Sequence, residues 1–84
     1  MPTISVFYGI TIIMRITRKE HNPPHIHAFY GSESAPFKIS DGEIMEGTFP
    51  SSGSELVKKF ILHYQKELLD MWETEKYRHL EPID

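Results

Sequence analysis

The chain has 84 residues, of which 39% are hydrophobic and 25% charged, and its formal net charge is −3 with the histidines neutral. This length suits a single domain, and we expect residues 1–84 to form one fold. The absence of cysteine excludes a disulfide framework and a thiolate zinc site. The acidic balance argues against nucleic acid as a partner, because nonspecific DNA binding depends on a basic surface.

The sequence also argues against a membrane protein. The longest apolar run, Ile10 to Ile16, contains Thr11 and Arg15 and falls far short of the roughly 18 residues that a membrane helix needs. The opening Met-Pro-Thr-Ile lacks the basic stretch that begins a signal peptide. Together with the lack of disulfides, these features predict a cytoplasmic protein with no membrane contact.

Short strands are predicted within residues 3–49, because β-branched and aromatic residues alternate there with polar ones. The expected strands are 3–8, 10–17, 25–30, 35–40 and 43–49. Asp41-Gly42 is a strong signal for a two-residue hairpin with a left-handed Gly42. That turn would pair Ile39 with Ile44 and make residues 43–49 a fifth strand.

A helix is predicted after the break at 50–53, because apolar residues recur there at helical spacing. They are Val57, Phe60, Ile61, Tyr64, Leu68, Met71 and Trp72. We expect one long helix over about 52–76, with Ser52 and Glu55 as a capping box, and a frayed tail over 77–84. The predicted fold is α+β, a twisted antiparallel meander of four or five strands with this helix packed on one face.

Three of the five histidines lie in the run His21-Asn22-Pro23-Pro24-His25-Ile26-His27. Proline fixes its own φ and keeps the preceding residue out of the helical region, so the run is extended. His25 and His27 then project from the same face of a strand. The run indicates a functional site but does not identify a reaction.

One interpretation of this run is a metal site formed by His21, His25 and His27. Neutral imidazoles bind zinc or another divalent transition metal, and three protein ligands with an open position are typical of catalytic zinc. The spacing matches no specific metal motif, and the sequence does not set the direction of His21. The other interpretation is structural, with imidazoles bonded to backbone carbonyls and the prolines packed on an aromatic ring.

Acid–base chemistry is a further hypothesis for the same place. Histidine titrates near neutrality, Glu43 or Glu46 is placed to orient an imidazole, and Arg15 is suited to bind a phosphate or carboxylate. The catalytic candidates are therefore His25, His27, Glu46 and Arg15. The alternative is a solvated sheet face with weak cross-strand charge pairs. The chain has no cysteine nucleophile, glycine-rich phosphate loop or G-x-S-x-G elbow.

Several stretches, in order along the chain, resemble one bacterial family. They are the opening Met-Pro-Thr-Ile, Phe7-Tyr8-Gly9-Ile10, the histidine run, Gly42-Glu43-Ile44-Met45-Glu46-Gly47 and Glu67-Leu68-Leu69-Asp70-Met71-Trp72. On these residues the chain resembles the family called domain of unknown function 4160. The resemblance implies a small intracellular bacterial protein, often encoded beside another small protein in a manner that suggests toxin–antitoxin or regulatory pairs. It implies no settled activity.

The expected function is therefore a small cytoplasmic bacterial binding or regulatory module, such as one member of a toxin–antitoxin-like pair, with the histidine run as its working surface. The expected partner is another protein or a second copy of the chain, bound at an open sheet edge. The alternative is a metal-dependent hydrolase or nuclease that uses His21, His25 and His27, with Glu46 as its base. The sequence leaves open whether the protein is an enzyme.

Overall fold

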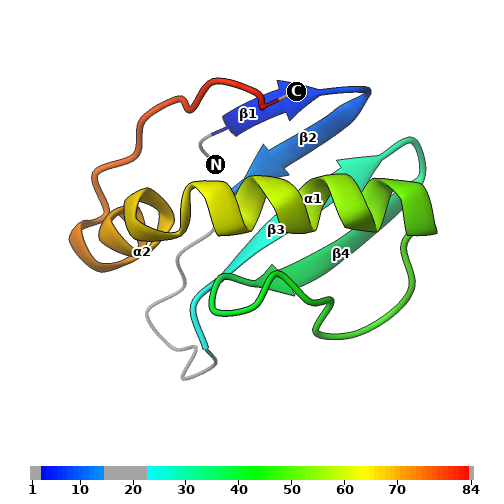
Figure 1. Ribbon diagram of the computed structural model, residues 1–84, viewed down its shortest axis with the longest axis horizontal. Helices are drawn as coiled ribbons and strands as arrows, with labels where there is room; N and C mark the ends of the chain where they lie inside the picture. Colours follow the sequence, from blue (N-terminus) through cyan, green and yellow to red (C-terminus); the bar gives the residue numbers. More distant parts are fainter. Residues whose placement is uncertain (1–2, 15–22, 84) are drawn as a thin grey trace.

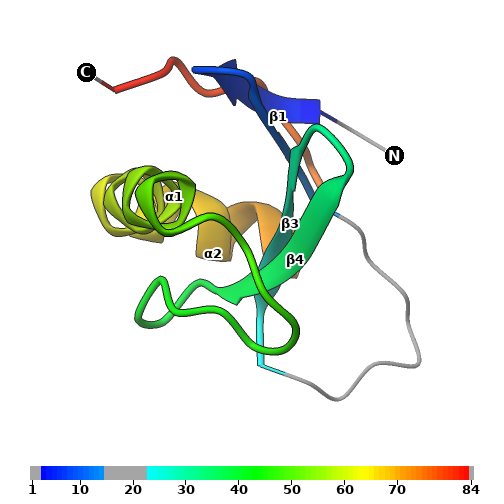
Figure 2. The ribbon, with the colours of Figure 1, turned by 90° about the vertical axis from the view of Figure 1, so that its right-hand side faces the viewer.

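The structure is a computed structural model that describes residues 3–14 and 23–83. Its elements are β1 (Thr3–Phe7), β2 (Ile10–Ile13), β3 (His25–Tyr30), β4 (Glu33–Lys38), α1 (Ser51–His63) and α2 (Gln65–Thr74). The strands form one antiparallel sheet in the order β1-β2-β3-β4, and α1 lies along one of its faces (Figures 1 and 2). The α+β class is confirmed, with four strands and two helices in the described residues.

The β1–β2 and β3–β4 hairpins are closed by two-residue turns of different types. Tyr8 and Gly9, between β1 and β2, both have positive φ, at 50° and 77°, which is the type I′ geometry. Between β3 and β4, Gly31 has a φ of 59° and Ser32 has no positive φ, as in a type II′ turn. A bulky side chain is rare in the left-handed region, and that of Tyr8 is 64% exposed.

The predicted fifth strand is wrong. The segment that follows β4 pairs with it only through an isolated bridge between Phe37 and Ile44. Ile44 therefore lies opposite Phe37 instead of Ile39, and the connection is two residues longer than predicted. The predicted strand 10–17 is described only to Met14, and its remainder lies outside the described residues.

Local hydrogen bonds explain this change of register. Gly42 has the predicted positive φ, at 73°, but Asp41 does not, so the type I′ turn is not formed. The Asp41 carboxylate instead accepts the Glu43 N–H at 2.9 Å. The N–H groups of Lys38 and Gly42 donate to the carbonyls of Glu43 and Lys38. Asp41 thus folds the chain back on itself by a side-chain turn, and the paired strand does not continue.

The one long helix that the sequence predicts is two helices. Tyr64, with φ −107° and ψ 26°, separates α1 from α2. Next to it, the side-chain amide of Gln65 donates to the carbonyls of Ile39 at 2.8 Å and Ser40 at 2.7 Å. The break between α1 and α2 thus lies where Gln65 is hydrogen-bonded to the chain after β4. No helix in the described residues is long and apolar enough to cross a bilayer.

The N-terminus of α1 also differs from the prediction. The helix begins one residue early, after Pro50, and no side chain caps it. The capping box of Ser52 and Glu55 is therefore wrong.

The apolar stripe of the helices forms the core with one face of the sheet. Its buried members are Val57, Phe60, Ile61, Leu68 and Met71. Phe60 stacks on Phe7 of β1 with 5.1 Å between ring centroids. Trp72, which we expected to complete the buried stripe, lies only partly buried at the margin of this core.

The tail after α2 differs from the frayed segment that was expected. It returns to the sheet beside β1 (Figure 1), where the Leu80 N–H donates to the carbonyl of Ile4 at 2.8 Å. Leu80 is only 6% exposed, and the Tyr64 hydroxyl donates to the Glu81 carbonyl at 2.8 Å. The tail therefore closes the core next to the first strand.

Candidate functional site

The sheet face turned away from α1 carries two rows of side chains that cross all four strands. The first row is Val6, Thr11, Phe29 and Ser34, and the second is Thr3, Ile13, His27 and Pro36. We call these eight residues the outer face. None of them is Asp, Glu, Lys or Arg, although such residues make up 25% of the chain. Val6 is 51% exposed, Thr11, His27 and Phe29 are half-buried, and Ile13 is buried.

His25 begins β3 at the margin of this face, and its side chain is enclosed. It is 3% exposed. Its Nδ1 lies 3.0 Å from the carbonyl oxygen of Pro23, the distance at which a protonated Nδ1 donates a hydrogen bond. Its ring lies 5.1 Å from that of Trp72 in α2. The stiff Pro23-Pro24 pair thus places a carbonyl against the imidazole, and the ring joins the start of the strand to a helix.

His25 and His27 are neighbours, as alternation along a strand predicts. Their ring centroids are 5.3 Å apart and the rings meet edge to face at 68°. Within residues 3–14 and 23–83, no third His, Cys, Asp or Glu joins them in a group that could hold a metal. His21 and Arg15 lie outside the described residues. The three-histidine metal site therefore stays a prediction.

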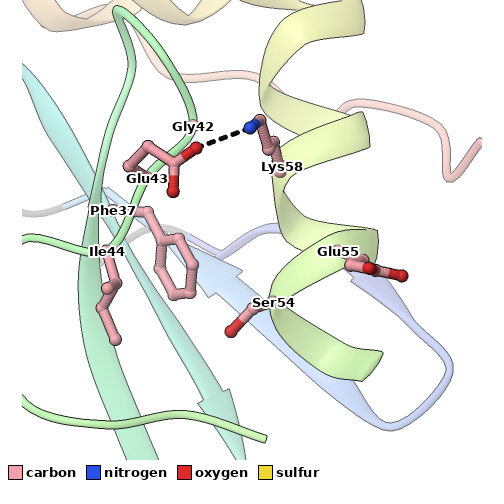
Figure 3. Close-up of a pocket in the computed structure, with 7 residues that line it drawn as sticks. All are labelled: Phe37, Gly42, Glu43, Ile44, Ser54, Glu55 and Lys58. Carbon is pink, nitrogen blue, oxygen red and sulfur yellow. Dashed lines mark hydrogen bonds and ion pairs between the residues drawn. The ribbon is translucent and has the colours of Figure 1, made fainter. Parts of the chain in front are cut away.

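The two glutamates proposed as partners for the imidazoles lie beyond β4. Glu43 forms an ion pair with Lys58 of α1 (Figure 3). Glu46 is exposed in the loop after the bridge at Ile44, and it belongs to no metal-binding group in the part of the chain that is described. Its role as a base stays a prediction.

A pocket that the sequence did not predict lies between α1 and the loop after β4 (Figure 3). Its volume is about 200 Å³, and its lining residues are Phe37, Gly42, Glu43, Ile44, Ser54, Glu55 and Lys58. A Cβ at Gly42 would lie 2.8 Å from Cγ of Lys58, so glycine is what allows the loop to approach the helix this closely. Gly42 was recognised as a turn residue, but no sequence signal showed that it faces a helix 16 residues further along.

Two ionisable groups beside the pocket are held in their charged forms. The hydrogen bond to Glu43 raises the pKa of the Lys58 ammonium, and the charge of Glu43 acts in the same direction. The Glu43 backbone N–H, with help from Lys38, lowers the pKa of Asp41. The Lys58 ammonium at the mouth of the pocket and the Asp41 carboxylate beside it are therefore charged at neutral pH.

Residues 9–73 match the family model described as Domain of unknown function (DUF4160). The chain belongs to this family. The match runs from the turn before β2 into α2, so it includes the histidine run, the outer-face residues of the middle strands and the pocket. Comparison of this DUF4160 chain with curated proteins found no match, and comparison with solved structures found none either. The resemblance predicted from the sequence is thereby confirmed, and the description of the family assigns no activity.

Proposed function

We propose that this DUF4160 protein is a small protein-binding module whose working surface is the outer face of its sheet. The observation that carries the proposal is the lack of charge on these eight residues, since the charged Lys38, paired with His25, lies only at their margin. The solvated face of an antiparallel sheet is usually polar, whereas the centre of a protein interface is depleted of charge and rich in aromatic residues. Phe29 lies on the inner strand β3, near the centre of this face, and Val6 lies on the edge strand β1.

The occupant we propose is an amphipathic helix of a partner protein. Four strands about 4.8 Å apart span roughly 15 Å, which is close to the 10–12 Å diameter of a helix with its side chains. Such a helix would add a third layer to the sheet, a common way to bury a second sheet face. The family resemblance suggests as partner the small protein encoded beside this one, as in a toxin–antitoxin or regulatory pair, and a shared cytoplasmic location is part of this proposal.

The sheet edges, where the sequence predicted that the partner binds, already form backbone hydrogen bonds within the chain. On β1 the carbonyl of Ile4 already accepts the N–H of Leu80, and on β4 the carbonyl of Pro36 accepts that of Met45. Pro36 also has no N–H to donate. These contacts favour the face over the edge as the place of binding.

The test is a binding measurement with the small protein encoded by the adjacent gene, purified separately. Thr11→Glu places a charge in the middle of the outer face, and we expect at least a tenfold loss of affinity because a buried, unpaired carboxylate is costly. Lys59→Glu makes a charge change on the exposed surface of α1 and serves as the control. Circular dichroism and urea unfolding check that both variants fold.

Three outcomes decide between the occupants. A loss of affinity confined to Thr11→Glu supports the proposal. Equal binding by Thr11→Glu and the unchanged protein overturns it, as does the absence of binding by a protein that is monomeric in sedimentation. A homodimer that Thr11→Glu dissociates replaces the partner helix by a second copy of the chain.

A metal-dependent hydrolase or nuclease is the second candidate, and the 5.3 Å separation of the His25 and His27 rings favours it. Two adjacent imidazoles can supply two of the three protein ligands of a catalytic zinc site, with His21 as the third. The test is NMR titration of the ring protons with and without one equivalent of zinc. Ring signals of both histidines that shift together support the metal site, and signals that zinc leaves unchanged reject it.

A further inference from the structure

We infer that the pocket between α1 and the loop after β4 binds one arginine side chain of a partner protein. This inference does not depend on the proposed function, because the pocket lies beside α1 and shares no residue with the outer face. A different part of the same partner, or a different protein, can supply the arginine.

The size and floor of the pocket fit a single side chain. Its volume of about 200 Å³ is below the ~300–1,000 Å³ typical of small-molecule sites. Phe37, which is 1% exposed, and the half-buried Ile44 give it an apolar floor. Small pockets with an apolar floor can receive the anchor residues that dominate many protein interfaces.

The charges of the lining favour a cation. Glu43, Glu55 and Lys58 sum to −1, and the whole chain is also acidic. In Figure 3 one carboxylate oxygen of Glu43 meets Lys58, whereas the other faces the space above Phe37. The Ser54 hydroxyl lies at the other end of the Phe37 ring, and the Glu55 carboxylate turns away from the pocket. The acceptor above the apolar surface is thus the second carboxylate oxygen of Glu43.

An arginine side chain matches this arrangement. Its aliphatic stem can lie on Phe37 and Ile44 while the charged end stays near the mouth, as long cationic side chains commonly do. Guanidinium has five N–H donors and no acceptor, and its planar fork can donate to the Glu43 oxygen that does not meet Lys58. An anion that approached Lys58 would lie against the Glu43 carboxylate, whose charge repels it.

The experiment is an NMR titration of the isotope-labelled full chain with N-acetyl-arginine methylamide. The citrulline derivative, which is close in shape but neutral, and the glutamate derivative, which is anionic, serve as comparisons. We expect the arginine probe to shift the amide signals of residues 42–44 and 54–58, with a millimolar dissociation constant. It should bind about threefold more tightly than citrulline, as befits a partly exposed charge pair.

Two variants with opposite expected effects on arginine binding test the inference. Glu43→Gln should weaken binding of the arginine probe about threefold, and Lys58→Gln should strengthen it, because it removes a competing cation and frees the Glu43 carboxylate. Lys59→Gln, also on α1 but outside the pocket, is the matched control and should change nothing. Tighter binding of the glutamate probe, a loss of arginine binding in Lys58→Gln, or equal binding of arginine and citrulline would each overturn the inference.

Discussion

Two neighbouring rows of side chains, one on each face of the sheet, cross the same four strands but differ in burial. On the helix-covered face, the row Ser5, Ile12, Ala28 and Ala35 is at most 2% exposed. The neighbouring row is offset by one residue on each strand and lies on the other face. Its members, which are half-buried or exposed, are Val6, Thr11, Phe29 and Ser34. The only aromatic residue of the two rows, Phe29, lies on the uncovered side.

In these two rows, residue type alone does not predict burial, which follows the position of the helices. The covered face has a serine in its most buried row, and the uncovered face has a phenylalanine in its most open one. A face that is apolar but uncovered is the kind of surface that binds another protein. Four measurements sharpen or break this contrast.

The largest expected effect comes from comparing two phenylalanines. Phe60→Ala, which removes a fully buried ring stacked on Phe7, should lower the free energy of unfolding by about 3–5 kcal/mol. Phe29→Ala, on the outer face, should lower it by about 1 kcal/mol, because its ring is only half-buried. Urea unfolding of both variants gives the two values, and equal losses would show that the outer face is covered as well.

A second pair compares the adjacent histidines. His25→Ala removes an enclosed ring, its contact with Trp72 and the bond to Pro23, and we expect a loss of about 2 kcal/mol. His27→Ala should cost less than about 1 kcal/mol, since its ring is half-buried. Thermal unfolding at pH 7 measures both losses. A larger loss for His27 would show that it, and not His25, holds the fold together here.

The third measurement concerns a buried hydroxyl. The Oγ of Ser5 is buried among apolar residues without a hydrogen-bond partner in the described part of the chain. Ser5→Ala should therefore raise the free energy of unfolding by up to about 1 kcal/mol. Ser34→Ala on the exposed row is the control and should stay within about 0.5 kcal/mol of the parent. Destabilisation by Ser5→Ala would mean that the hydroxyl is satisfied after all.

The smallest effect is expected at the margin of the outer face, where Lys38 pairs with Asp41 at 3.1 Å. The Glu43 N–H and Lys38 hold the pKa of Asp41 below its ordinary value of 3.8. A carboxylate with a lowered pKa contributes stability above its unfolded-state pKa, and this contribution disappears as the pH falls through the folded-state pKa. Asp41→Asn should therefore be slightly less stable than the parent at pH 7, and the difference should disappear as the pH falls through the folded-state pKa of Asp41. A difference that does not change with pH would rule out this linkage.

Much of the fold follows from local sequence patterns, and the exceptions have identifiable causes. Alternation located β1 and β3 correctly, and the helical stripe named the core residues of both helices. The break at Tyr64 carries no glycine or proline signal; it lies next to the bonds from Gln65 to the distant carbonyls of Ile39 and Ser40. The fifth strand failed because Asp41 bonds to Glu43 instead of entering the left-handed region.

The candidate site was only partly predictable for the same reason. His25 and His27 are two residues apart on one strand, so their proximity could be predicted from the sequence. The enclosure of His25 by Trp72 joins residues 47 positions apart, and the pocket joins the loop after β4 to a helix. The absence of charge on the outer face becomes visible only when the register of all four strands is known.

The tail that bonds to β1 has a consequence for the solubility of the free protein. An open edge strand is a template on which further chains can add and aggregate. At β1 this edge has a bulge between Thr3 and Ser5 and the bond from Leu80, and at β4 it has Pro36 and the loop bonds to Glu43 and Met45. The chain thus protects its own edges against strand-by-strand growth. Under the proposed function, these protected edges would keep the chain from aggregating while the outer face is unoccupied.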